Sequence, residues 1–271
     1  MRIRQFYSNF GNHFAEAMAK KYDLILNTTS IEMDEPLFIF GCYNEKQIWH
    51  ALSHNSGGQL TVICWAGSDA NNLKYLQGIF NHFPRVKHIA ISPWIAANLG
   101  MNALPFYRIP VVPYDHSDIK PEPLGDSIYM YKPDSRVYNG GIYQQVKEAL
   151  PEFNFIESNW GDHTREEMLE IYKKCFIGLR FTEHDGLSNT VCEMGMMGRR
   201  VINNGDVPNC IKYDSKNIGQ IIETIKKEHE YRWVKNIFKW KSRIESHKVK
   251  NYLDIGTDFL NTEYYESLYS S

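Results

Sequence analysis

The sequence predicts an α/β protein built from two doubly wound parallel sheets, and three observations lead to this. Short apolar segments with strand character alternate with helical segments along the chain, which is typical of parallel β–α–β units. Most connections between these segments are short, as they are in such units. The length of 271 residues fits two domains at the usual size of roughly 150 residues each.

The first half of the chain contains six predicted strands. The clearest is 36–41, a continuous apolar run of the kind expected for a strand that is buried on both faces. A predicted helix at 45–54 is followed by Gly57 and Gly58, which end it. The other predicted strands are 2–7, 23–29, 59–67, 86–92 and 107–113, and the other predicted helices are 13–22, 70–83 and 94–100.

A proline-rich stretch separates the two halves. Four prolines lie between residues 110 and 123, together with Asp115, Ser117 and Asp118. This composition is typical of a linker or hinge. We therefore place the boundary within 112–125, with 1–114 as the first domain and 115–271 as the second.

The second half repeats the alternation of strands and helices. Thr164 and Glu167 form a capping-box pattern, which predicts a helix over 164–175. A second helix, 188–198, begins at Ser188 or Asn189. The remaining predicted helices are 142–150 and one from about 218, and the predicted strands are 127–132, 152–158, 176–182 and 199–204.

The composition is that of an ordinary globular protein and excludes several classes. Hydrophobic residues make up 43% of the chain and charged residues 23%, with a formal net charge of -2. No apolar run approaches the ~20 residues of a membrane-spanning helix, and the N-terminus lacks a signal-peptide pattern. The five cysteines are scattered without a CxxC pair. This predicts reduced core thiols and a cytoplasmic location.

The segment between the predicted strand 176–182 and the helix 188–198 contains the residues best suited to bind a ligand. Asp185 and Glu193 lie eight positions apart, and Gly186 beside the first acid permits close approach of backbone to a ligand. The start of the helix offers free N–H groups and a positive dipole end to a phosphate. Glu193, about one turn further along, could accept hydrogen bonds from a ribose diol, and Asp185 from sugar hydroxyls.

The segment 185–202, DGLSNTVCEMGMMGRRVI, resembles the Glu-x7-Glu motif of the retaining glycosyltransferases with the GT-B fold, whose familiar form is EGLPNVLLEAMACGxPVV. Three further segments resemble parts of that family: EEMLEIYKKCFIGLRFT, HIAISPWIAANLGMNALPFYRIPVVPYD and FLNTEYYESLY. The resemblance implies two Rossmann-like domains that face a cleft. The first would lie on the acceptor side, and the second would bind a nucleotide-sugar and end in closing helices.

The resemblance also implies roles for individual residues. Asp185 would contact the donor sugar, with Glu183 able to share that role because Asp is one methylene shorter than the usual Glu. Glu193 would bind the ribose. The other expected donor-side contacts are the backbone of Gly186 and Leu187, the amides of Ser188, Asn189 and Thr190, the diphosphate-facing cations Lys132, Arg136 and Arg180, and Gly11 in a reduced glycine loop.

Asp69 in ICWAGSD occupies the loop that faces the acceptor in this family. It is expected either to orient an acceptor hydroxyl or to act as the N-cap of a helix that begins at Ala70.

The function implied by the resemblance is retaining transfer of a hexose or pentose from a nucleoside-diphosphate sugar to an acceptor hydroxyl. Neither a metal nor a further cofactor is expected. Alternative hypotheses are a transferase that acts on modified DNA bases, a phosphorylase or epimerase of the same fold, and a non-catalytic module that binds nucleotide-sugars. The acceptor is not identified by the sequence.

The segment 231–250 interleaves aromatic residues with Lys and Arg, and residues 226–250 carry nine Lys and Arg against three Glu. One interpretation is a membrane-surface helix with Trp233, Phe238 and Trp240 as anchors, which would make a cytoplasmic protein peripheral at the membrane. Another is a nucleic-acid surface. The third is a helix whose aromatics pack on the core while its charges face water.

Overall fold

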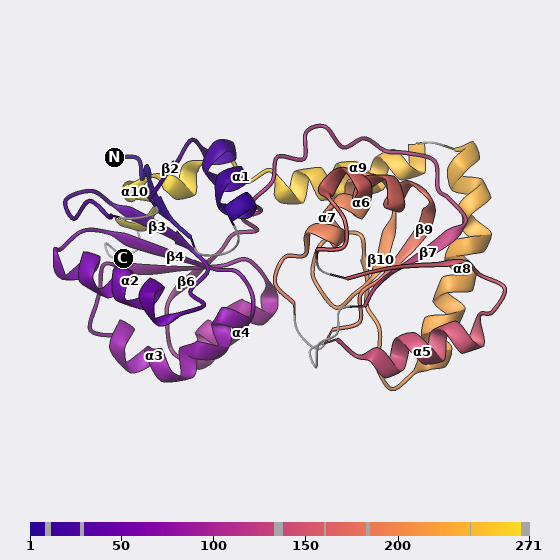
Figure 1. The fold of residues 1–271 in the computed structure, drawn as a ribbon, viewed down its shortest axis with the longest axis horizontal. Coiled ribbons are helices and arrows are strands. Elements are labelled where there is room, and N and C mark those ends of the chain that lie inside the picture. The colour runs from indigo at the N-terminus through magenta and orange to yellow at the C-terminus, as the bar shows by residue number, and fades with distance from the viewer. Residues whose placement is uncertain are drawn as a thin grey trace. The chain divides into compact units, whose positions relative to one another are not determined.

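The computed structural model describes residues 1–8, 12–27, 30–132, 138–159, 161–182, 185–238 and 240–266 (Figure 1). Gly11, Arg136 and Glu183, which the sequence analysis assigned to the site, lie outside these ranges. The chain divides into two compact units. One comprises Met1–Asp115 with the segment from Leu253 onward, and the other comprises His116–Tyr252. Among the described helices, none combines the length and the apolar character that crossing a bilayer requires.

The first unit is built on a six-stranded parallel sheet with the order β2-β1-β3-β4-β5-β6. Strands β3 and β4 are buried along their whole length, as their uninterrupted apolar sequence predicts. The strands are β1 Gln5–Tyr7, β2 Ile25–Leu26, β3 Leu37–Phe40, β4 Thr61–Trp65, β5 Val86–Ala90 and β6 Phe106–Arg108, and the helices are α1 Asn12–Tyr22, α2 Glu45–Ser56, α3 Leu73–Phe80 and α4 Pro93–Met101, with a 3-10 helix η1 at Ser68–Asn72.

The C-terminal segment belongs to this first unit, whereas the sequence analysis had placed it in the second domain. It contains the 3-10 helix η2 (Asp258–Leu260) and α10 (Thr262–Glu266). The backbone N–H of Ile3 donates to Leu260 at 2.6 Å, and the Phe259 ring packs against Tyr22 and Phe38. Pairing with the N-terminal strand region, far away in sequence, is the physical reason for the difference.

The second unit has a five-stranded parallel sheet with the order β11-β10-β9-β7-β8. In Figure 1, α5 and α8 lie side by side. The short strand β11 is the one strand here that the sequence analysis did not predict. The strands are β7 Ser127–Tyr131, β8 Phe155–Ser158, β9 Cys175–Leu179, β10 Arg200–Ile202 and β11 Cys210–Ile211, and the helices are α5 Gly140–Ala149, α6 Arg165–Lys173, α7 Asn189–Met196, α8 Ile218–Ile237 and α9 Trp240–Leu253.

The strand order of the second unit defines a topological switch point between β7 and β9. The chain first moves from β7 outward to β8, then returns to β9 on the other side of β7 and continues outward to β10 and β11. In open α/β sheets of this order, ligands bind beyond the carboxyl ends of the two strands at the switch point. The loops after β7 and β9 are therefore where the fold places a site.

Candidate active site

The loops that follow β7 and β9 are joined directly to one another. The backbone N–H of Asn139 donates to the carbonyl of Phe181 at 3.2 Å, and Tyr138 pairs with Thr182 in an isolated antiparallel bridge. These contacts bring the first turn of α5, which begins at Gly140, close to the end of β9. Both α5 and α7 therefore begin at the carboxyl end of the sheet, at its switch point.

Arg180 is the first residue after β9, and it organises this end of the sheet. The guanidinium donates to both oxygens of Asp185, with Nη2 at 3.2 Å from Oδ1, and it also donates to the Tyr138 hydroxyl at 2.8 Å. Its Cζ lies 4.4 Å from the centre of the Tyr131 ring. A planar guanidinium that pairs bidentately and stacks on an aromatic ring is held in one orientation. Asp185 is fixed with it.

The helices α5 and α7 both begin without a side-chain cap. Neither Asn139 nor Ser188, at their N-cap positions, accepts a hydrogen bond from its helix. By contrast, α6 begins with a complete Thr164–Glu167 capping box, as predicted, and the N-cap Asn217 of α8 accepts from Gln220. Uncapped first-turn N–H groups and the positive dipole end together favour an anion. Both helix starts at the switch point lack a side-chain cap, although at α5 the N–H groups of Gly140 and Ile142 donate to the carbonyls of Tyr138 and Asn139 at 2.9 and 3.1 Å, with Gly141 between them.

Glu193 lies one turn into α7, on the same helix face as Asn189. It is buried, and Arg165 Nε donates to its Oε1 at 3.1 Å, while the same guanidinium contacts both oxygens of Asp118 at 3.3 Å. Burial raises the pKa of Glu193 to about 7, against the opposing effect of the Arg165 charge. In the described part of the chain, the Asn189 Oδ1 is buried and has no hydrogen-bond partner.

The remaining predicted donor-side residues surround this end of α7. Gly186, Leu187, Ser188 and Thr190 are half-buried, and the Thr190 hydroxyl accepts a hydrogen bond from Tyr172 at 3.1 Å. Lys132, directly after β7, lies 3.7 Å from the Glu157 carboxylate at the end of β8. Glu157 is also paired with Lys147. Lys132 therefore lies at the carboxyl end of the sheet, and the Glu157 carboxylate offsets part of its charge.

Asp69 in the first unit has a different environment. Its carboxylate is buried and accepts hydrogen bonds from the backbone N–H groups of Cys42, Ala66, Gly67 and Ala70, at distances from 2.7 to 3.2 Å. Burial raises its pKa to about 6, although these hydrogen bonds oppose the shift. The carboxylate joins the loops that follow β3 and β4, so its geometry matches a structural clamp better than an acceptor contact.

Sequence reasoning missed four side chains of the second-unit site, namely Tyr131, Tyr138, Arg165 and Asp118. It also missed the start of α5. The signal for the latter was present in Asn139-Gly140-Gly141 after a predicted strand, because the absence of side chains at the two glycines lets a ligand approach the backbone closely. Among the described residues, no group of three or more His, Cys, Asp or Glu is arranged to hold a metal ion.

Comparison with known proteins finds similarity of structure. No family model matches the sequence, and no curated protein matches it. TarM is similar with a TM-score of 0.61 and 11% identity, over 97% of this chain and 59% of that chain. A mutant of S. aureus TarM in complex with fondaparinux, alpha-GlcNAc-glycerol and UDP is similar with a TM-score of 0.56 and 11% identity, over 90% and 59%.

The lipopolysaccharide outer core galactosyltransferase WaaB has a TM-score of 0.49 at 10% identity, over 93% of this chain and 95% of that chain, which is too low to define a shared fold. The similarity to TarM, together with the two parallel sheets, confirms the predicted class of a GT-B fold with two Rossmann-like domains. The chain spans about three fifths of the length of the TarM structures.

Proposed function

We propose that the chain is a glycosyltransferase that binds a nucleoside-diphosphate sugar at the carboxyl end of β7 and β9. The observation that carries this proposal is the pair of uncapped helix starts, α5 and α7, at the switch point of one sheet, with Asp185 and Glu193 at the second of them. Two N–H-lined helix ends suit the two phosphates of a diphosphate. The GT-B fold of the chain adds support from analogy.

In this proposal the second unit supplies three kinds of contact. The first turns of α5 and α7, together with Lys132, stabilise the charge that develops on the departing diphosphate. Glu193 accepts hydrogen bonds from the ribose diol, with Asn189 Oδ1 on the same face as a further acceptor. Asp185, fixed by Arg180, accepts from hydroxyls of the donor sugar.

The proposed reaction is a retaining transfer. The bond between the anomeric carbon and the diphosphate oxygen breaks, and its electron pair leaves with the diphosphate. The acceptor hydroxyl forms the new bond on the same face, and its proton passes to the oxygen of the departing diphosphate. A positively charged, oxocarbenium-like sugar would be stabilised by the nearby carboxylate of Asp185, which Arg180 holds in place.

A screen of the purified protein against UDP-, GDP-, ADP-, CMP- and dTDP-linked sugars tests the proposal, with thermal shift for binding and mass spectrometry for turnover. One class of donor should stabilise the protein, and Glu193→Gln should remove that stabilisation. Glu228→Gln is the matched control, since Glu228 is also a shielded, ion-paired glutamate of the second unit but is paired with Arg200 and Lys235. Absence of stabilisation by every donor, or equal loss in both variants, would contradict the proposal.

A further inference from the structure

At the end of α8 and the start of α9, the usual distribution of side chains is reversed, because apolar residues are exposed to solvent. Between residues 231 and 240, every described residue that is exposed is aromatic or aliphatic: Tyr231, Trp233, Ile237, Phe238 and Trp240. This excludes the interpretation in which the aromatics of this segment pack on the core while its charges face water. Several large apolar side chains exposed within one short segment are typical of an interaction site.

The described charged residues of the same stretch, Arg232 and Lys235, are directed inward. Lys235 is buried and donates to the Glu228 carboxylate at 2.8 Å, and Arg232 donates to the carbonyl of Gly125 at 3.3 Å. Their charges are therefore used to hold α8 against the second unit. The apolar side chains that point to solvent have no such role within the fold.

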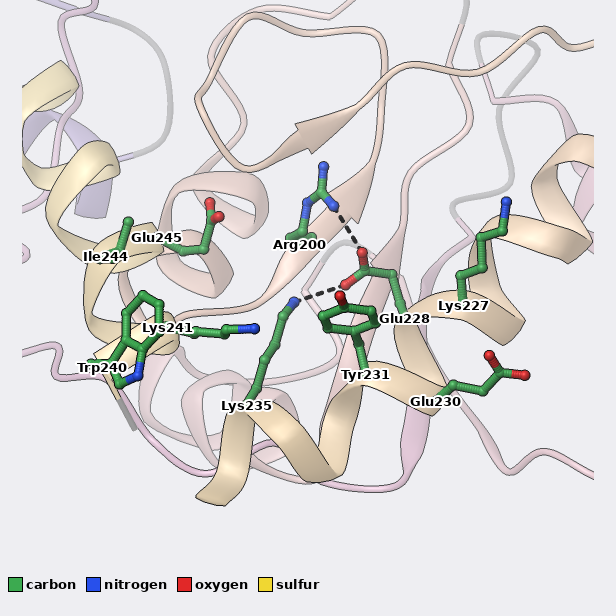
Figure 2. A pocket seen from close by; sticks show the side chains of 10 residues that line it. All are labelled: Arg200, Lys227, Glu228, Glu230, Tyr231, Lys235, Trp240, Lys241, Ile244 and Glu245. Carbon is green, nitrogen blue, oxygen red and sulfur yellow. Dashed lines mark hydrogen bonds and ion pairs between the residues drawn. The ribbon is translucent and has the colours of Figure 1, made fainter. Parts of the chain in front are cut away.

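Cations and carboxylates both line the pocket beside this apolar surface: Arg200, Lys227, Lys235 and Lys241, with Glu228, Glu230 and Glu245. A pocket of about 550 Å³ opens between α8 and α9, and Figure 2 shows Lys227 and Tyr231 on its α8 side and Trp240 and Lys241 on its α9 side. Lys241 Nζ lies 5.1 Å from the centre of the Tyr231 ring and 5.7 Å from that of Trp240. Further along α9, Arg243, His247 and Lys248 are exposed.

We propose that this α8–α9 surface, defined by the five exposed residues named above and the flanking cations, docks on an anionic lipid bilayer. Tryptophan and tyrosine favour the membrane–water interface, where the ring is apolar and its N–H or O–H remains hydrated. Exposed Lys and Arg beside them match the negative charge of the headgroups. The exposed cations Lys226, Lys227, Arg243 and Lys248, together with Lys241 in the pocket, supply the charge complementarity.

The detailed arrangement favours a membrane over a nucleic acid. Of the described cations within the apolar stretch, Arg232 and Lys235 are turned into the protein and offer no charge to a phosphate backbone. Ile237, which is among the most exposed residues of the surface, contributes to lipid insertion but offers nothing to a base. Lys241 lies beside the Tyr231 and Trp240 rings, where it would meet a lipid headgroup at the depth of these interfacial aromatics.

Flotation of the full chain with vesicles tests the proposal, using phosphatidylcholine alone and an equal mixture of phosphatidylcholine and phosphatidylglycerol. The protein should float with the mixed vesicles, and Trp233→Ser with Trp240→Ser should reduce binding by at least tenfold. Trp49→Ser is the matched control, because Trp49 is 63% exposed in the first unit and Trp233 is 62% exposed. Both sets of side chains are at the surface, so the variants should fold, as circular dichroism would verify.

A second pair of variants tests the charge component separately. Lys241→Gln with Arg243→Gln should weaken binding to the mixed vesicles by about fivefold per cation removed, and raised salt should mimic this loss. Lys20→Gln with Lys74→Gln, both exposed cations of the first unit, should have no effect. Vesicle binding needs no sugar donor, so its outcome is independent of the proposed transferase activity.

Three results would overturn the proposal. One is failure of the wild-type chain to float with mixed vesicles at low salt. Another is equal weakening by Trp49→Ser and by the Trp233→Ser, Trp240→Ser pair. The third is a change in oligomeric state or a loss of DNA binding in that pair without a change in flotation, which would assign the surface to a second copy of the chain or to a nucleic acid.

Discussion

Arg180 and Arg199 are two buried arginines at opposite ends of the same sheet, and their partners differ in kind. Arg180, just after β9, pairs with the Asp185 carboxylate. Arg199, just before β10, is fully buried, and its described hydrogen bonds all go to backbone carbonyls: those of Glu122, Pro123, Tyr172, Lys173, Cys175 and Met197. Burial lowers the pKa of Arg199 to about 10.

The difference shows how one sheet assigns stability and binding to its two ends. At the amino end of the strands, the chain uses its own arginine to satisfy carbonyls at the ends of α6 and α7. At the carboxyl end, the N–H groups that begin α5 and α7 have no side-chain cap. One end is closed by internal contacts, and the other keeps donors that suit an anionic ligand.

The largest expected effect is a loss of stability at the amino end of the sheet, where Arg199 lies. Arg199→Met should lower the free energy of unfolding by about 3 to 5 kcal/mol, because several buried carbonyls lose their donor at once. Urea denaturation measures this, and Arg200→Met is the control, since the Arg200 side chain is 35% exposed and makes one ion pair. A loss below about 1 kcal/mol would contradict the clamp role of Arg199.

The next largest expected effect is on turnover, through Asp185 at the carboxyl end of the sheet. Asp185→Asn should lower turnover of the donor by about 10²- to 10³-fold, in the range seen when one preorganised electrostatic contact is removed. Thermal stability should also fall, because the buried Arg180 guanidinium loses its carboxylate partner and keeps only its contacts to Tyr138 and Tyr131, so turnover is compared well below the unfolding transition of the variant. Asp162→Asn is the control, a loop acid after β8 that accepts from Asn159. Equal loss in both variants would argue against a donor-sugar contact at Asp185.

A third effect concerns pH. With a pKa of about 7, Glu193 becomes ionised and a better acceptor for a ribose diol as pH rises, so donor affinity should increase about tenfold between about pH 6 and about pH 8. Calorimetric titration across this range measures it, and Glu193→Gln should flatten the profile. An unchanged profile in that variant would assign the pH dependence to another group.

The raised pKa of Glu193 has the opposite consequence for stability, which should decrease as pH rises. The folded state holds the Glu193 proton more tightly than the unfolded chain does, so the free energy of unfolding should fall as pH rises from 4.5 through about 7. Denaturation of wild type and Glu193→Gln at several pH values separates this contribution from those of other groups.

The smallest expected effect comes from adding a side-chain cap to α7, and it tests most sharply whether the two ends of the sheet differ in function. Ser188→Asp supplies α7 with a side-chain cap and a negative charge, which should stabilise the fold by about 0.5 to 1 kcal/mol and weaken donor binding. Thr164→Asp on α6, where a cap already exists, should do neither. If Ser188→Asp stabilises the protein and leaves donor affinity unchanged, the start of α7 is not part of the donor site.

Local signals in the sequence predicted the main elements of the site. The strand–loop–helix order around Asp185 and Glu193 and the capping box of α6 depend on neighbouring residues, and both are present in the structure. The partners of these acids do not follow from local sequence. Arg165 is 28 positions from Glu193, and Asp118 is 47 positions from Arg165. Only the sheet order brings them together.

Asp69 shows a second limit of the same kind. Its position before Ala70 predicted the N-cap of a helix that begins at Ala70, but the 3-10 helix η1 begins at Ser68 with Gly67 at the N-cap position and has no side-chain cap. The Asp69 carboxylate instead accepts from the N–H of the adjacent Ala70. The contact that joins two loops comes from Cys42, which is 27 positions earlier. Similarly, the spacing of aromatics in α8 does not show which of them face solvent, because Lys235 and Arg232 occupy the inner positions through contacts with Glu228 and Gly125.

The most direct test of the central claim is an amide NMR titration with a nucleoside diphosphate. UDP and GDP would be added separately to the ¹⁵N-labelled chain, and shifts at the starts of α5 and α7 would be compared with those around Gly198 and Arg199. We expect one diphosphate to shift the amides of Gly140, Gly141, Asn189 and Thr190 while the amino end of the sheet stays unchanged. Shifts confined to the Arg199 end, or none with either nucleotide, would contradict a donor site at the switch point.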